Sequence, residues 1–314
     1  MVEQEIVHRS YFTNIPVEYY VPEDTQVIFV ADYFKSDLLG GAELTLDAIM
    51  QAAPVKIYRL HSRSVNSYLI EKNKDKLWVF GNYTLLSDHI YDLLTETKIN
   101  YCIAEFDFKY CMYRSENLHF RATGQKCGCK DSEHCKTIFK FMNGARKIYW
   151  MSSKQRDKFF DVMPELSKTE EKNVVLNSVF DQETIDYILS LKKERKEPKE
   201  EKFYWILGNG SWIKGIEETK NWCEKNKISY KLLPSLPYKE FLKVLSDGYG
   251  LVFMPLDHDT CPRLTIEAKM LGLDVLVNDN VLHGEEDWFA CNNEEILIQH
   301  VRNGQKRFWD SFLK

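Results

Sequence analysis

Short apolar runs and helical segments alternate along most of this 314-residue chain. The run TQVIFVA at 25–31 is rich in β-branched residues, and a helical pattern over 42–53 follows it. A continuous apolar run of this length favours a buried strand, whereas helices repeat every 3.6 residues. Strands that alternate with helices pair in parallel, because the helix returns the chain to the same edge of the sheet. The sequence therefore predicts an α/β protein built on parallel sheets.

The alternation stops at a charged segment, LKKERKEPKEEK, and then restarts, which predicts two domains. A chain of this length fits two domains of roughly 150 residues each. We expect strands at 25–31, 55–60, 76–81, 100–105, 146–152, 173–179, 203–208, 229–234, 250–256 and 274–279. The expected organisation is an N-terminal Rossmann-like domain over 1–180 with a cysteine-rich insertion at about 107–136, a linker over 181–202, a second Rossmann-like domain over 203–290, and a C-terminal helix over 291–314 that packs back toward the first domain.

Charge and hydropathy exclude several classes of protein. The net charge of −5 argues against a nucleic-acid or anionic-membrane partner. No apolar run approaches the ~20 residues that span a bilayer, and the polar start MVEQEIVHRSYF lacks the apolar middle of a signal peptide. We therefore expect a cytoplasmic protein without a transmembrane segment, whose eight cysteines are free thiols or metal ligands rather than disulfides.

Two acidic residues, Asp259 and Glu267, follow the strand expected at 250–256 and have seven residues between them. Pro262 suits the first turn of a helix between them. A helix that starts at the carboxyl end of a parallel strand points free N–H groups into the crevice where open α/β sheets bind ligands. The two carboxylates would then bracket a phosphate and a sugar. The alternative is a loop aspartate beside an Arg263–Glu267 surface ion pair, and the spacing alone does not separate the two.

Glycines follow two other expected strands. In LGNGSWIKG, Gly208 frees the backbone to approach a ligand, and Asn209 shares the same loop. Lys214 lies in the first turn of the next helix, where it opposes the helix dipole unless an anion lies between them. Gly40 and Gly41 occupy the equivalent place in the N-terminal half. Taken singly, these features are better explained by ordinary turns and a solvated lysine.

In this order and spacing, the motifs resemble those of GT-B-fold glycosyltransferases, nearest the retaining family four, the glycosyl transferases of group 1. The similarity is close over about 203–287 and thin over 1–180. The matching segments are Gly40-Gly41-Ala42-Glu43, LNSVFD at 176–181, Gly208 with Lys214-Gly215, Asp259-x7-Glu267, and EAKMLGLDVLVND at 267–279.

The resemblance implies two Rossmann-like domains whose parallel sheets face each other across a cleft, with a nucleotide-sugar donor between them. Lys214 would neutralise the diphosphate, Glu267 would take the ribose hydroxyls, and Asp259 would contact the transferred sugar. Gly41 would let the N-terminal domain close on the donor. The implied donor-binding set is Gly40, Gly41, Gly208, Asn209, Lys214, Pro262, Arg263, Leu264 and Glu267, and the implied catalytic set is Asp259, Lys214 and Glu267.

The implied activity is retaining transfer of a sugar to a glycan, lipid-linked or small-molecule acceptor, with no metal required for catalysis. This chain departs from the family pattern at three places. Asp259 is one methylene shorter than the family's first glutamate, and no arginine precedes Lys214-Gly215, so phosphate contacts fall to Lys214 and Arg263. Glu105 or Asp107 stands where the family often has a histidine. The first two departures slightly favour the alternative, a catalytically degenerate GT-B-like binding or scaffold protein that uses the cysteine-rich insertion for partner contact.

Four cysteines fall within a short polar, turn-rich stretch that includes CGCKDSEHC, with His119 and His134 among them. Four soft ligands in such an insertion suit a structural tetrahedral zinc. Free thiols are the main alternative, and a disulfide or an iron–sulfur cluster would use the same residues. The predicted metal ligands are Cys111, Cys127, Cys129 and Cys135.

Overall fold

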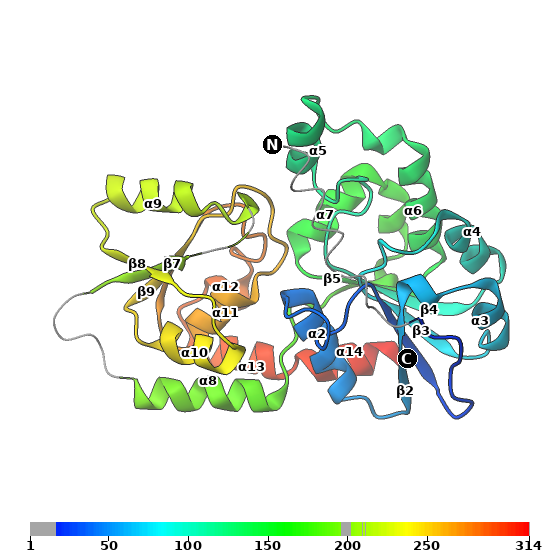
Figure 1. The fold of residues 1–314 in the computed structure, drawn as a ribbon, viewed down its shortest axis with the longest axis horizontal. Helices are drawn as coiled ribbons and strands as arrows, with labels where there is room; N and C mark the ends of the chain where they lie inside the picture. Colours follow the sequence, from blue (N-terminus) through cyan, green and yellow to red (C-terminus); the bar gives the residue numbers. More distant parts are fainter. Residues whose placement is uncertain (1–16, 196–201, 209, 211, 314) are drawn as a thin grey trace. The chain divides into compact units, whose positions relative to one another are not determined.

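The computed structural model describes residues 17–195, 202–208, 210 and 212–313. These residues form two compact units, each built on its own parallel sheet (Figure 1). The first unit comprises the described parts of Met1–Met151, Gln155–Leu176 and Trp309–Lys314, and the second comprises those of Ser152–Lys154 and Asn177–Phe308. The α/β class and the parallel strand pairing predicted from the sequence are confirmed.

The first unit holds a six-stranded sheet, counted over the described residues, in the order β2-β1-β3-β4-β5-β6. All adjacent strands of this sheet pair in parallel. Strand β1 is buried along its whole length, because apolar side chains cover both of its faces. The strands are β1 (Val27–Ala31), β2 (Ile57–His61), β3 (Leu77–Phe80), β4 (Asn100–Glu105), β5 (Lys147–Trp150) and β6 (Asn173–Val175).

Helices connect these strands, as parallel pairing requires. Short helix α3, which the sequence patterns did not predict, lies between β2 and β3. The α-helices are α2 (Gly41–Gln51), α3 (Ser67–Lys72), α4 (Asp88–Glu96), α5 (Glu116–Thr123), α6 (Glu133–Gly144) and α7 (Ser153–Val162), and the 3-10 turns are η2 (Ser62–Ser64), η3 (Cys129–Asp131), η4 (Pro164–Lys168) and η5 (Glu170–Lys172).

The second unit holds a four-stranded sheet, counted in the same way, in the order β10-β9-β7-β8. Its core contains Ile206, Cys223, Val252 and Met254. The elements are β7 (Tyr204–Leu207), η6 (Trp212–Lys214), α9 (Ile216–Lys225), β8 (Tyr230–Leu233), α10 (Tyr238–Ser246), β9 (Gly250–Phe253), α11 (Arg263–Met270), β10 (Asp274–Val277) and α12 (Asp287–Ala290).

The segment predicted as a linker over 181–202 begins instead with a helix, α8 (Gln182–Glu194). Asp181 caps its first turn, and its buried face of Ile185, Ile188 and Leu191 packs toward α10 and α11 (Figure 1). The charged residues that suggested a linker lie at the end of this amphipathic helix, so the charge run concealed the apolar stripe that precedes it.

The C-terminal segment forms two helices, α13 (Glu294–Arg302) and α14 (Gly304–Phe312). The last turn of α14 belongs to the first unit, where the Trp309 indole donates a hydrogen bond to the carbonyl of Ile49 at 2.9 Å. Within the described part of the chain, no helix is both long enough and apolar enough to cross a membrane.

Candidate functional site

The second sheet has a topological switch point between β7 and β9. The chain leaves β7 toward β8 on one side, and then adds β9 and β10 on the other side. The loops that follow β7 and β9 therefore diverge at neighbouring strand ends. In open α/β sheets this divergence leaves a crevice at the carboxyl ends of the strands, which is the usual place for a ligand.

Two glycines shape the loop that follows β7, and both are explained by close backbone packing. The Gly208 N–H bonds to the Leu233 carbonyl at 3.0 Å, and a Cβ at Gly208 would lie 2.6 Å from that oxygen. Gly215 has φ +63°, and a Cβ there would lie 2.2 Å from the carbonyl oxygen of Met254. The Gly215 contact and a hydrogen bond from Leu256 N–H to Ile213 O at 2.8 Å tie η6 to the end of β9, so Lys214 is held at the switch point. Asn209 lies outside the described residues.

Lys214 and Asp259 meet at the switch point. The Nζ of Lys214 lies 2.7 Å from Oδ2 of Asp259, and the side chains are 37% and 16% exposed. The backbone of Asp259 is fixed on both sides, because its N–H bonds to Asn280 O at 2.8 Å and its carbonyl accepts Leu282 N–H at 3.0 Å. The structure thus brings together two of the three residues predicted as catalytic, as a partly exposed ion pair.

Glu267 is held by a different set of side chains. Its Oε1 accepts a hydrogen bond from the Tyr238 hydroxyl at 2.5 Å and lies 3.5 Å from Arg263 Nε. Burial raises the pKa of Glu267, although Arg263 and Tyr238 favour its charged form. The Arg263–Glu267 pair does form, but its side chains are only 4% and 3% exposed, so it is an interior pair and not the surface pair considered above.

The guanidinium of Arg263 points into the protein interior and not toward the N-terminus of helix α11. It donates to the carbonyl of Val179 and lies 3.7 Å above the Phe180 ring. The N-cap of α11 is Pro262, which has no N–H to offer. The backbone amides available to an anion at this helix start are therefore those of Arg263 and Leu264. The Arg263 side chain is bonded to other groups in the interior.

In the first unit, Gly40 is the N-cap of α2 and Gly41 is its first residue. A Cβ at Gly40 would lie 2.3 Å from Oε2 of Glu43, so the glycine makes room for this carboxylate. Glu43 is buried, and burial raises its pKa, partly offset by hydrogen bonds to its own backbone and to Asn82. The positive end of the α2 dipole therefore already has an acidic side chain, Glu43, beside it.

A buried charge cluster follows β4 in the first unit. Lys109 Nζ lies 2.9 Å from Glu105 Oε1 and 3.3 Å from Asp107 Oδ2. The Tyr83 hydroxyl donates to the other oxygen of Glu105 at 2.7 Å. Glu105 is fully buried, whereas Asp107 is 26% exposed and also pairs with Arg114. Of the two acids predicted to replace the family's histidine, Asp107 is therefore the more accessible.

Burial affects these two carboxyls differently. The pKa of Glu105 is raised by burial despite the neighbouring Lys109. Burial alone would also raise the pKa of Asp107, but Arg114 and Lys109 outweigh it and lower that pKa. Sequence reasoning missed Lys109 and Arg114 as members of this cluster. The Glu105–Lys109 spacing of four residues was the one available signal, and it is uninformative in a loop.

His61 ends β2 between two carboxylates. Its Nδ1 lies 2.5 Å from Glu18 Oε1, and its Nε2 lies 3.0 Å from Asp37 Oδ2. Burial opposes the charged imidazolium, but the bonds to Glu18 and Asp37 outweigh it and raise the pKa of His61. Burial likewise opposes both carboxylates, yet the pKa values of Glu18 and Asp37 are lowered by their hydrogen bonds. The three groups are therefore charged together at mildly acidic pH.

We expect His61→Gln to destabilise the protein most between about pH 4.5 and 6.5. The contribution of His61 is fully present below its ordinary pKa of 6.5 and is lost as pH rises through the raised value. The stability contributed by the Glu18 and Asp37 carboxylates is present above their ordinary pKa values. It is lost as pH falls through the lowered pKa values of the folded protein. Urea unfolding should show a loss of about 1.5–3 kcal/mol at pH 5.5 and a smaller loss at pH 9. The control is His89→Gln on the exposed face of α4, and a pH-independent loss for His61→Gln would contradict the assignment.

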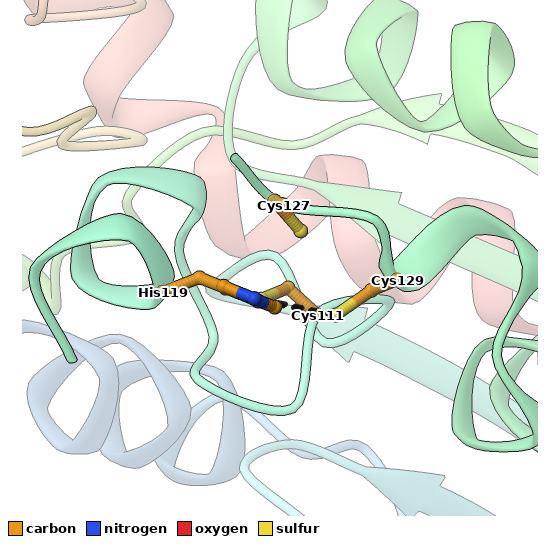
Figure 2. A group of neighbouring side chains, drawn as sticks. All are labelled: Cys111, His119, Cys127 and Cys129. Carbon is orange, nitrogen blue, oxygen red and sulfur yellow. Dashed lines mark hydrogen bonds between the residues drawn. The ribbon is translucent and has the colours of Figure 1, made fainter. Parts of the chain in front are cut away.

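The cysteine-rich insertion gathers four ligand-bearing side chains: Cys111, His119, Cys127 and Cys129 (Figure 2). Their ligand atoms all lie within 4.8 Å of one another. Three of the four predicted ligands belong to this group, and His119 stands in it where the prediction had Cys135. Cys135 is buried in the first turn of α6, where its N–H bonds to Ser132 Oγ at 3.1 Å. A histidine in the intervening helix was visible in the sequence, but nothing there chose it over the fourth cysteine.

Comparisons with known proteins find similarity in structure and not in sequence. No known family matches the chain, and no curated protein matches it. The chain is similar to Anabaena Alr3699/HepE in complex with UDP, at 10% identity over 92% of this chain and 100% of that one, with a TM-score of 0.58. It is also similar to the catalytic domain of starch synthase IV from Arabidopsis thaliana bound to ADP and acarbose, at 8% identity over 92% and 99% of the two chains, with a TM-score of 0.54. At such identities the likeness establishes the fold alone, which is GT-B, as the motifs predicted.

Proposed function

We propose that the protein is a retaining glycosyltransferase that moves a sugar from a nucleotide-sugar donor to a hydroxyl acceptor. The observation that carries the proposal is the Lys214–Asp259 ion pair at the β7/β9 switch point. A cation and a carboxylate at that place suit the two ends of a sugar diphosphate, since the phosphates need positive charge and the sugar hydroxyls need acceptors. Similar solved structures bind UDP or ADP, which supports a nucleotide ligand on this fold.

Donor binding requires Lys214 to exchange partners. A partly exposed ion pair stabilises a protein by only about 0–1 kcal/mol, so a diphosphate can displace Asp259 from Lys214 at small cost. Helix α11 begins nearby in sequence, and the amides of Arg263 and Leu264 would receive the second phosphate. Asp259, released from Lys214, would then hydrogen-bond the sugar that is transferred.

The proposed chemistry moves one glycosyl group. The bond between the anomeric carbon and the diphosphate oxygen breaks, with both electrons leaving on the diphosphate. The acceptor oxygen forms the new bond on the same face of the sugar, and its proton passes to the departing phosphate. Lys214 stabilises the negative charge that grows on the leaving group, and Asp259 faces the positive charge of the oxocarbenium-like state. No step in this scheme is assigned to a metal ion.

A second candidate function is supported by the state of Glu267. Its carboxylate already bonds to Tyr238 and Arg263 and is almost fully buried. A ribose would have to share this acid, and the side chain of Arg263 is not available to phosphate. Together with the shortened Asp259, this arrangement favours a GT-B-like binding protein that holds a nucleotide without transferring a sugar.

A thermal-shift screen with UDP, GDP and ADP, each with and without an attached sugar, tests the proposal. At a ligand concentration one hundred times Kd, binding adds about 2.7 kcal/mol to the free energy of unfolding, which should raise the Tm by several degrees. The same samples, assayed for nucleoside diphosphate release and for the anomeric configuration of the product, distinguish the two candidates. Release with retained configuration supports the transferase, binding without release supports the binding protein, and no shift with any ligand overturns both.

A further inference from the structure

The cysteine-rich insertion has almost no hydrophobic core of its own. Between Met112 and His134, the described side chains that are buried are Ser115 and Cys129. Helix α5 has no buried residue, and Phe120 on it is 56% exposed. An isolated eight-residue helix is unstable in water because nucleation is costly. Some interaction other than apolar packing must therefore hold α5 and η3 in place.

The four clustered side chains have the spacing of a tetrahedral metal site. Zinc bonds to sulfur at about 2.3 Å and to nitrogen at about 2.0–2.1 Å, which places two sulfurs about 3.8 Å apart and a sulfur and a nitrogen about 3.5 Å apart. Here the Sγ atoms of Cys111 and Cys129 are 3.7 Å apart. Nδ1 of His119 lies 3.5 Å from the first sulfur and 3.3 Å from the second. A disulfide would need about 2.05 Å between the sulfurs.

We infer that the insertion binds one structural zinc ion through Cys111, His119, Cys127 and Cys129. Thiolate and imidazole ligands select zinc over magnesium or calcium, which prefer oxygen. Four protein ligands fill a tetrahedral shell and leave no position for water or substrate, so the ion would be structural rather than catalytic. The side chains converge from α5, from the loop before it, from the loop between α5 and η3, and from η3, as Figure 2 shows.

Contacts around the cluster hold the first cysteine and the imidazole in place. Cys111 Sγ lies 3.4 Å from the carbonyl oxygen of Ser115, the residue that caps the first turn of α5. The Tyr113 ring also packs edge-on against the His119 ring, with centroids 4.9 Å apart. The ring contact restricts the direction of the histidine, as contacts around metal-binding side chains commonly do.

The zinc site would also fix part of the charge cluster that follows β4. Cys111 N–H bonds to Phe108 O at 3.0 Å, and Arg114 N–H bonds to Cys111 O at 2.8 Å. Arg114 adopts φ +63°, and its guanidinium bonds to Asp107 Oδ2. Cys111 thus anchors the turn that presents Arg114 to Asp107, so metal loss should loosen this contact. The zinc assignment does not depend on the proposed transferase activity.

Metal analysis of the full chain, purified without chelator from zinc-supplemented cells, tests the inference. We expect about one zinc per chain in the wild type and a loss of at least fivefold in His119→Ala and Cys127→Ser. The matched controls are His134→Ala and Cys135→Ser in the same insertion, which should retain zinc. His134 bonds to the carbonyl of Lys109 instead of to the cluster.

Two measurements on the wild type keep the test independent of mutant folding. Cobalt(II) exchanged into the site should give the intense visible bands of tetrahedral thiolate coordination. Chelation should expose Arg121, Lys126 and Lys130 to trypsin, and added zinc should restore resistance. Absence of zinc together with absence of cobalt bands would overturn the inference, as would equal zinc loss in the two control variants. A Cys111–Cys129 disulfide found by mass spectrometry under reducing purification would also overturn it.

Discussion

Lys214→Ala is expected to abolish the thermal stabilisation that a nucleoside diphosphate gives to the wild-type protein. The lysine supplies a positively charged side chain at the β7/β9 switch point, whereas the Arg263 side chain bonds to the carbonyl of Val179 in the interior. A hydrogen bond to a charged group contributes about 1.5–3 kcal/mol, so the Kd should rise roughly 10- to 150-fold. Thermal shift and titration calorimetry with the best ligand of the screen measure this loss directly.

Two companion variants separate binding from general damage. Lys220→Ala removes a lysine of α9 that is paired with Glu217, and it should leave the nucleotide-induced shift intact. Asp259→Asn removes the partner of Lys214, so it should preserve or tighten diphosphate binding while lowering sugar transfer. The free energy of unfolding of Lys214→Ala without ligand should change by less than about 1 kcal/mol, because its ion pair is partly exposed. Undiminished nucleotide binding by Lys214→Ala would remove the basis of the proposed site.

Glu267→Ala is expected to lower the free energy of unfolding by about 3–5 kcal/mol, because it leaves Arg263 buried without its carboxylate. Both side chains of this pair are almost fully buried, and Tyr238 loses its acceptor as well. Urea unfolding followed by far-ultraviolet circular dichroism measures the change. Loss of nucleotide binding in this variant must then be judged at a temperature where the variant is folded.

The control for this variant is Glu217→Ala, which breaks the exposed Glu217–Lys220 pair on α9 and should cost less than about 0.5 kcal/mol. The double variant Arg263→Met with Glu267→Leu should recover much of the lost stability, because a packed apolar pair can replace a buried ion pair. A small effect of Glu267→Ala, similar to that of Glu217→Ala, would show that this carboxylate does not hold the interior together.

The fold was largely predictable because apolar periodicity and glycine placement are local properties of the sequence. The runs at 25–31 and 250–256 gave buried strands β1 and β9, and the ordered motifs gave the GT-B fold. The helix over 182–194 was missed because its last turn opens a charged segment, which was interpreted as part of a linker. Helix α3 is only six residues long, too short for periodicity to identify.

The sequence predicted where the candidate site residues lie along the chain, but not which side chains bond to them. The sequence placed Asp259 in the loop after the strand at 250–256 and Lys214 in the first turn of the helix that follows the strand at 203–208. The structure pairs the two side chains, with Lys214 in the 3-10 turn η6 before α9 instead of in the helix. Spacing could not show that Tyr238, on another helix, bonds to Glu267. In the insertion, it likewise could not show that α5 turns His119 toward the cysteines. Such partners depend on how separate elements pack, and that information is not local.

The Asp259–Lys214 contact bears on how a turnover would end. Under the proposed function, the spent diphosphate is the more tightly held product, since most of the charge remains on it. Asp259 is tethered a few ångströms from Lys214 by fixed backbone bonds, so its effective concentration there is very high. Asp259 can therefore re-form its ion pair with Lys214 as the diphosphate begins to dissociate, which speeds the release of the diphosphate. Asp259→Asn should accordingly make the enzyme more sensitive to inhibition by its own nucleoside diphosphate.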